Sequence, residues 1–212
     1  MRVSGNGPAF PGSLPAMDLL LAICQAIGLA LAVGVGGPIA ALFITAMAGL
    51  NAGIDTRGTD FEFLGSNGFL VAIFVVNVGA YFLARSEGPR RVPQVIFAGI
   101  FGAIAGGASL AAEGESAVVG IVLGLLVGAG SALIATDVLI GARRRAERAS
   151  LEKDPVAGNA LEGMFALAGI VIALLALFLP PLSLLGLVAL GVLAAGRRRR
   201  AGEKYEGLRV LR

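Results

Sequence analysis

Few residues of this chain could do chemistry, and those that stand out lie inside apolar stretches. Asp137 is an acid near the end of one such stretch, while Asn77 and Tyr81 lie one helical turn apart in another. Gln25 and Thr45 are polar residues of a third. Polar and ionisable side chains are costly inside a membrane span, so each of these residues is a candidate for lining a solute path.

Each candidate also has a purely structural interpretation. An arginine of the run Arg143–Arg145 could reach back along the helix end and pair with Asp137. Asn77 could hydrogen-bond a neighbouring helix, an interaction worth only about 0.6 kcal/mol on average in membranes. Thr45 and Gln25 could form similar bonds in the core. The residue types alone leave both interpretations open.

Several kinds of chemistry are excluded by what the chain lacks. It contains no histidine, so the commonest general base and transition-metal ligand are missing. The single cysteine, Cys24, lies in an apolar stretch and cannot form an internal disulfide. No phosphate-binding loop and no nucleophile with a paired base is evident. We therefore expect no enzymatic activity, no metal site and no cofactor.

The triplet Gly36-Gly37-Pro38 interrupts the apolar block 17–50, at a place where a helix interior tolerates these residues least. A continuous helix of this length would run roughly 50 Å, against about 30 Å for the hydrocarbon core of a bilayer. We therefore predict a broken first helix. The sequence does not distinguish one kinked span from a span followed by a re-entrant half-helix.

Composition places these stretches in a membrane. Of 212 residues, 57% are hydrophobic and 15% are charged, with a mean hydropathy of +0.86, which is typical of a polytopic all-α membrane protein. We predict a flexible tail at 1–16, a single transmembrane domain at 17–196 and a basic tail at 197–212. The predicted spans are 17–50, 68–84, 92–112, 117–141, 160–179 and 182–196.

Charge predicts how the spans are oriented. Every Lys and Arg except Arg57 falls in the N-terminal tail or in one of three basic segments, which the positive-inside rule places in the cytoplasm. Pro180-Pro181 would form a hairpin turn, so that two short spans separate the last two basic segments. The prediction is six spans with both termini cytoplasmic. Because the positive charge lies against helix ends, the net charge of +3 does not indicate nucleic-acid binding.

A shift of 92 positions places Gly36 of the first span on Gly128 of the fourth. The stretch Gly128, Ala129, Gly130 and Ser131 would then face the break. In the predicted topology these two spans run in opposite directions, as in the inverted three-plus-three repeats of many secondary transporters. Small residues at every fourth position are also the ordinary way in which membrane helices pack. Both interpretations stay open.

Four segments carry a resemblance to a known family: Ala41–Leu50, Phe61–Ser66, Phe178–Leu182 and Lys204–Arg212. With these segments the chain resembles an uncharacterised family of bacterial integral membrane proteins, catalogued as a domain of unknown function. The resemblance implies a multi-pass protein of the bacterial inner membrane. In that family the second span often carries acids near the positions of Asn77 and Tyr81. The resemblance implies no substrate.

Two functional hypotheses follow. The first is a small channel or transporter for an ion or small solute, with its path at Gly36, Gly37 and Pro38 and lined by Thr45, Asn77, Tyr81, Gly128, Gly130, Ser131 and Asp137. The second is a non-transporting scaffold or accessory subunit that binds partner helices through its glycine-rich faces. Both hypotheses imply contact with membrane lipids, and we expect a homo-oligomer.

Overall fold

The computed structural model describes residues 15–83, 91–149 and 155–209, and within these ranges all regular structure is helical. An all-α fold is therefore confirmed for the described part of the chain. Of the predicted N-terminal tail, residues 1–14 lie outside it. The helices are α1 (Pro15–Gly49), the short 3-10 helix η1 (Glu62–Gly65), α2 (Asn67–Leu83), α3 (Arg91–Ala112), α4 (Ala117–Ala149), α5 (Pro155–Phe178) and α6 (Pro180–Arg209).

Four of the helices are long and apolar enough to cross a bilayer, and this indicates a membrane-embedded protein. Two further apolar helices are shorter. The four long segments are Met17–Gly49, Val92–Ala112, Ala117–Ala142 and Ala160–Phe178, and the shorter ones are Asn67–Ala80 and Pro180–Leu193.

Two helices continue past the ends predicted for their spans. α4 runs on through the arginine cluster to Ala149, and α6 runs on to Arg209 through most of the predicted basic tail. A change in hydropathy marks where a span ends, but Arg, Lys, Glu and Ala are good helix formers, so the helix itself does not end there.

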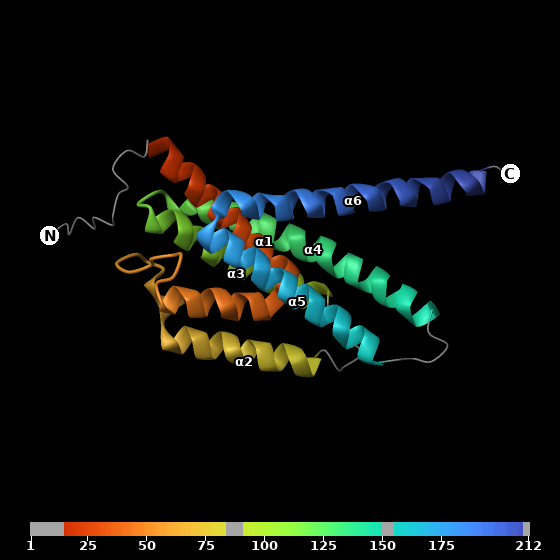
Figure 1. The fold of residues 1–212 in the computed structure, drawn as a ribbon, viewed down its shortest axis with the longest axis horizontal. Helices are drawn as coiled ribbons and strands as arrows, with labels where there is room; N and C mark the ends of the chain where they lie inside the picture. Colours follow the sequence, from red (N-terminus) through yellow and green to blue (C-terminus); the bar gives the residue numbers. More distant parts are fainter. Residues whose placement is uncertain (1–14, 84–90, 150–154, 210–212) are drawn as a thin grey trace.

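The first helix turns back on itself (Figure 1). At Gly37 the backbone has φ 62° and ψ −146°, which is far from helical values. Residues 15–36, here called the first segment of α1, run into the bundle, and residues 38–49, the return segment, run back. Gln25 Nε2 of the first segment donates a hydrogen bond to Gly53 O, just after the return segment, at 2.6 Å. The structure thus divides block 17–50 into two segments that run in opposite directions.

The first segment of α1 is the centre of the bundle. Every other helix contacts α1, and the run from Leu29 to Val33 is completely buried. By contrast, α2 packs mainly on α1 and η1, and near its start Phe69 stacks on Phe101 of α3 with ring centroids 6.2 Å apart. α2 is therefore held to the rest of the molecule mainly through the return segment and the loop that follows it.

Glycines bring α3 and α4 into backbone contact. A Cβ added at Gly102 would overlap Gly124 O, and one added at Gly106 would overlap Gly120 O. This close approach is the packing expected for small residues spaced four apart in membrane helices.

The chain forms a bundle with two chemically different ends (Figure 1). The acidic end contains the start of α1, the loop 50–66, the turn 113–116 and the junction between α5 and α6. The basic end contains the start of α3 and the ends of α4 and α6. Hydrogen bonds fix this arrangement, because Ser109 Oγ near the end of α3 donates to Ala22 O at 3.2 Å, and Ser183 Oγ at the start of α6 donates to Cys24 O at 3.2 Å.

This arrangement differs from the predicted topology in two respects. First, α1 begins at the acidic end and α6 finishes at the basic end, whereas both termini were predicted on one side. The charge argument counted block 17–50 as one crossing, but the return segment brings the chain back to its starting end. Second, the first segment of α1 and α4 run in the same direction, with Gly34 beside Gly128, so the two are not related by inversion.

The junction between α5 and α6 agrees with the hairpin interpretation. α5 ends at Phe178, only Leu179 separates it from α6, and α6 runs back alongside the bundle (Figure 1). Ser183 Oγ also donates to Pro180 O at 2.7 Å, which secures the first turn of α6.

The reversal at Gly37 can be tested by adding a single methyl group. The nearest neighbour of a Cβ at this position is Gln94 Nε2 at 3.9 Å, so Gly37→Ala meets no steric clash and adds only backbone strain. We expect it to lower the free energy of unfolding in detergent micelles by about 1–3 kcal/mol. Gly130→Ala is the matched control, because an added Cβ there meets no atom within 4 Å. Equal stability of the two variants would contradict the conformation of Gly37.

Candidate functional site

The break in α1 is the most unusual backbone feature of the described chain. Because Pro38 has no amide hydrogen, the carbonyl of Gly34 cannot receive its usual helical hydrogen bond. Gly36 packs directly on α5, where an added Cβ would lie 2.8 Å from the Cα of Gly169. Gly37 is buried. Non-helical backbone therefore lies inside the bundle and is covered by protein on at least one side.

Asn77 fastens α2 to the break. Its Nδ2 donates to Pro38 O at 2.7 Å and to Ile73 O, one turn earlier in α2, at 3.0 Å. Both partners are carbonyl oxygens, so the amide nitrogen must be the atom that faces them, and Oδ1 faces away. Of the two roles considered from the sequence, the structure shows the hydrogen bond to a neighbouring helix.

A second carboxamide reaches the break from α3. Gln94 Nε2 is the nearest atom to the position of a Cβ on Gly37, at 3.9 Å. Sequence reasoning missed this residue, because Gln94 lies in the first turn of its helix, where a polar side chain is ordinary. The signal that could have found it is its place inside the predicted span 92–112.

The glycine stretch of α4 lies beside α1, but one turn before the break. Gly34 is in contact with Ser131 Oγ and with the carbonyl of Gly128, and Ser131 Oγ donates to Gly128 O at 3.0 Å. A Cβ on Gly130 would meet no atom within 4 Å. Gly128 and Ser131 therefore pack against the first segment, and Gly130 faces away from these contacts.

The other predicted path residues are scattered. Thr45 is completely buried in the return segment, and its Oγ1 has no hydrogen-bond partner among the described residues. Asp137 is half-buried on α4, beyond Ser131 towards the basic end. Tyr81 is part of α2, and its side chain lies outside the described part of the structure. The structure thus brings Asn77 to the break, together with Gln94.

A second polar cluster, formed by Gln25, Gly53 and Ser109, joins the first segment of α1 to the loop that follows the return segment and to α3. Gln25 is buried, and both ends of its carboxamide are satisfied: Nε2 donates to Gly53 O, and Oε1 accepts from Ser109 Oγ at 2.8 Å. Gly53 has φ 83° and sits against Leu177 of α5. For Gln25, the core hydrogen-bonding interpretation is the one that the structure shows.

Acidic side chains come together at the acidic end. Glu113, in the turn after α3, lies close enough to Asp18 of α1 for their charges to interact. Partial burial raises the pKa of Glu113 above its ordinary value of 4.5, and repulsion from Asp18 raises it further. Ionised Glu113 therefore opposes folding.

The unpaired hydroxyl of Thr45 predicts an unusual response to mutation. A buried hydroxyl without a partner costs about 1–3 kcal/mol, and valine has nearly the same shape. We expect Thr45→Val to raise the free energy of unfolding in micelles by about 1 kcal/mol. Thr136→Val is the matched case, since Thr136 Oγ1 is also buried and lacks a partner among the described residues. A loss of stability in Thr45→Val alone would show that Thr45 Oγ1 binds a group that the structure does not contain.

The raised pKa of Glu113 predicts a pH dependence. An acid with a raised pKa binds its proton more tightly in the folded state, so stability should increase as the pH falls through that pKa towards 4.5. Below its ordinary pKa both states are protonated, and the gain is complete. Glu113→Gln should remove this slope and stabilise the protein at neutral pH by less than about 1 kcal/mol, because Glu113 is largely exposed to screening solvent.

The pH dependence attributed to Glu113 is checked by measuring the apparent unfolding midpoint in micelles between about pH 4 and 8. Glu115→Gln, at an exposed position of the same turn, is the control. An unchanged pH slope in Glu113→Gln would contradict the assignment.

Comparisons of the chain with protein-family models, with curated proteins and with solved structures give no match.

Proposed function

We propose that the protein is a small membrane channel or transporter for an ion or small solute, with its path at the break in α1. The observation that carries this proposal is the reversal at Gly37, where non-helical backbone lies within a bundle of apolar helices. In a bilayer such backbone is tolerated only where protein covers it or where it lines a watery cavity. Broken helices of this kind form the substrate sites of many secondary transporters.

The proposed orientation follows from the two ends of the bundle. The positive-inside rule places the basic end in the cytoplasm and the acidic end outside. The return segment rises only about 18 Å, at about 1.5 Å per residue, which is too short to cross the hydrocarbon core. α1 then forms a re-entrant hairpin entered from outside, and α2 to α6 make five crossings. The bacterial inner membrane is the location that the family resemblance implies.

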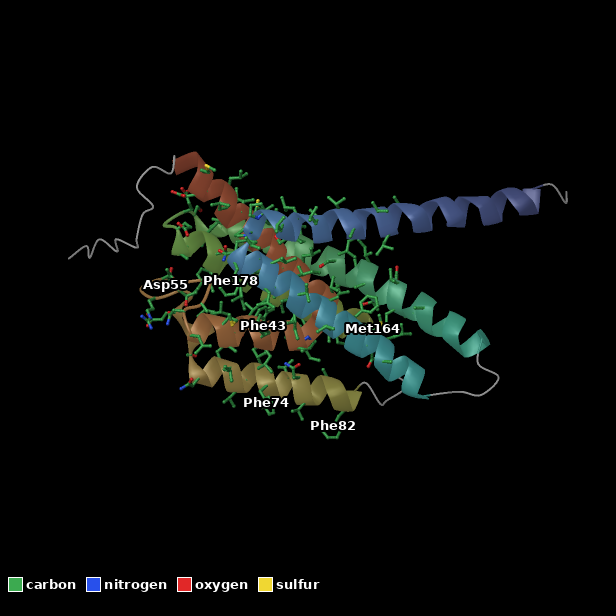
Figure 2. The ribbon with its side chains drawn as sticks, viewed as in Figure 1. Phe43, Asp55, Phe74, Phe82, Met164 and Phe178 are labelled. Atoms are coloured by element: carbon green, nitrogen blue, oxygen red, sulfur yellow. The ribbon has the colours of Figure 1, made fainter. Side chains whose placement is uncertain are left out.

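The scaffold hypothesis is supported by a different surface from the one predicted. The glycine faces of α3 and α4 pack on each other within one chain, so they are not available to partner helices. α2, however, packs mainly on α1 and η1, and Phe74 points outward from it (Figure 2). Val71 and Val75 on the same helix are also exposed. A second copy or a partner subunit could bind there. Lipid could cover the same surface equally well. The exposed surface of α2 is therefore weaker support for a scaffold than the break in α1 is for a transport path.

Flux through proteoliposomes tests the proposal. We expect purified wild-type protein to carry at least one probe from a panel of Na⁺, K⁺, Cl⁻ and glycerol faster than empty liposomes do. Asn77→Leu removes the hydrogen bond to Pro38 O, and it should lower that flux at least about tenfold, which corresponds to about 1.4 kcal/mol. Val75→Leu, an exposed neighbour on the same helix, should leave the flux unchanged.

The outcomes separate the two functions. Folding of each variant is checked by its unfolding midpoint, so that loss of flux is not confused with loss of structure. If folded wild-type protein carries none of the four probes, the path proposal fails and the scaffold function is favoured.

A further inference from the structure

We infer that the distal part of α6, residues 191–209, binds the phosphate groups of anionic phospholipids through four successive arginines, Arg197–Arg200, here called the arginine collar. The inference goes beyond the proposed transport function and does not depend on it. Three features carry it. α6 leaves the bundle before it reaches the collar, its positive charge is concentrated in the collar, and its length brings the collar to the lipid headgroups.

α6 separates from the bundle after Leu190. This residue is 8% exposed and is the last buried residue described in the helix. Val192 is already 66% exposed, and a Cβ added at Gly191 or Gly196 would meet no atom within 4 Å. Figure 1 shows α6 continuing away from the other helices to its end. The helix therefore stands free of the described bundle at the point where the arginine collar begins.

The positive charge of the distal part of α6 is concentrated in the arginine collar. Beyond it, the two acids Glu203 and Glu206 balance the two basic residues Lys204 and Arg209. Four successive positions of an α-helix lie about 100° apart, so together they occupy all sides of its axis. A folded protein partner would contact one side of such a helix, whereas a layer of lipid headgroups surrounds it. The collar therefore fits a lipid layer better than a protein surface.

The length of α6 brings the arginine collar to the level of the lipid phosphates. α6 begins with Pro180 at the acidic end, and the rise from there to Arg197 is about 25 Å. Because the hydrocarbon core of a bilayer is about 30 Å thick, a helix that crosses it brings Arg197 only to its far edge. Arginines at such an edge extend into the headgroup layer.

The residue type of the collar also favours phosphate. A guanidinium group keeps its positive charge and can bind two phosphate oxygens at once, which the ammonium group of lysine cannot do in the same planar geometry. Clusters of basic residues that directly follow a membrane helix are typical of binding to anionic lipids. The collar consists of arginine alone and directly follows the apolar part of α6.

A single introduced tryptophan can report on the lipid beside the collar, because the chain contains no tryptophan of its own. Leu193→Trp places it one turn before the collar, at a position that is 49% exposed. The full chain is reconstituted into vesicles of equal parts phosphatidylcholine and phosphatidylglycerol, and one or the other lipid carries brominated chains that quench tryptophan fluorescence on contact. We expect phosphatidylglycerol to be preferred about fivefold at this position, which corresponds to about 1 kcal/mol.

Variants of the collar are made in the Leu193→Trp chain. Changing all four arginines to Gln should remove the preference for phosphatidylglycerol. The double change Arg198→Gln with Arg200→Gln removes half of the charge and should lower the preference to about twofold, so it tests the collar even where the fourfold variant does not fold. Folding of each variant is checked by its unfolding midpoint in micelles.

Two controls lie at the acidic end. Arg57→Gln removes a positive charge far from the collar along the bundle and should leave the preference unchanged. Leu179→Trp, in an otherwise unchanged chain, places the tryptophan at the junction between α5 and α6, where the side chain is 52% exposed. It should report no preference for phosphatidylglycerol, because no arginine collar lies beside it.

Each outcome decides for or against the inference. A preference at Leu193→Trp that falls with the number of collar arginines supports it. Equal quenching by the two lipids in the folded chain would overturn it, and a preference that persists in folded collar variants would overturn the assignment to these arginines. Tight binding of RNA to the reconstituted chain, together with equal quenching by the two lipids, would assign the collar to a nucleic acid instead.

Discussion

The need to satisfy backbone polar groups within a membrane is the constraint on which the rest of this structure depends. Where α1 reverses at Gly37, the helix can no longer supply all of its own hydrogen bonds, and hydrocarbon offers none. The molecule responds by covering part of the reversal with protein. α5 covers Gly36 by direct backbone contact, and Asn77 of α2 takes up Pro38 O. The five other helices can be understood as the enclosure that this short stretch of backbone requires.

Close packing makes that enclosure possible. The first segment packs against several helices at close range, and Gly28, Gly34 and Gly36 face α6, α4 and α5 in turn. Dispersion between closely approaching backbones replaces the hydrophobic effect, which gives helices little reason to associate in lipid. Many of the glycines in α1, α3 and α4 thus serve contacts within a single subunit.

The sequence predicts local features of this fold well and its long-range geometry poorly. Gly36-Gly37-Pro38 indicates a break because its effect on a helix is local. The direction of the chain after the break depends on contacts between residues far apart in the sequence. Gln25 and Gly53 are separated by 28 positions, and Asn77 and Pro38 by 39. No local pattern encodes them. The predicted positions of the termini and the predicted inverted repeat both relied on a count of membrane crossings. That count requires the direction of the chain after Gly37, which the sequence does not give.

For the candidate site, the same distinction holds. Asn77 stands out because a carboxamide in the middle of an apolar helix is expensive, and it does lie at the break. Gln94 does not stand out, because a helix end is an inexpensive place for a polar group. Gly128 and Ser131 were expected to face the break, yet they lie one turn away. A shift of one turn between packed helices changes little in hydrophobicity, so composition cannot determine it.

The hydrogen bond between Ser183 Oγ and Cys24 O has a consequence for how the protein is made. Its two residues are 159 positions apart, and they join the centre of α1 to the last helix. At about 5–20 residues per second, roughly 8 to 30 seconds of translation separate the two ends of this contact. The hairpin is thus the first part of the domain to enter the membrane and the last to be fully enclosed. Until α6 is made, the face of the first segment at Cys24 and Gly28 lacks the Ser183 contact that it has in the complete fold.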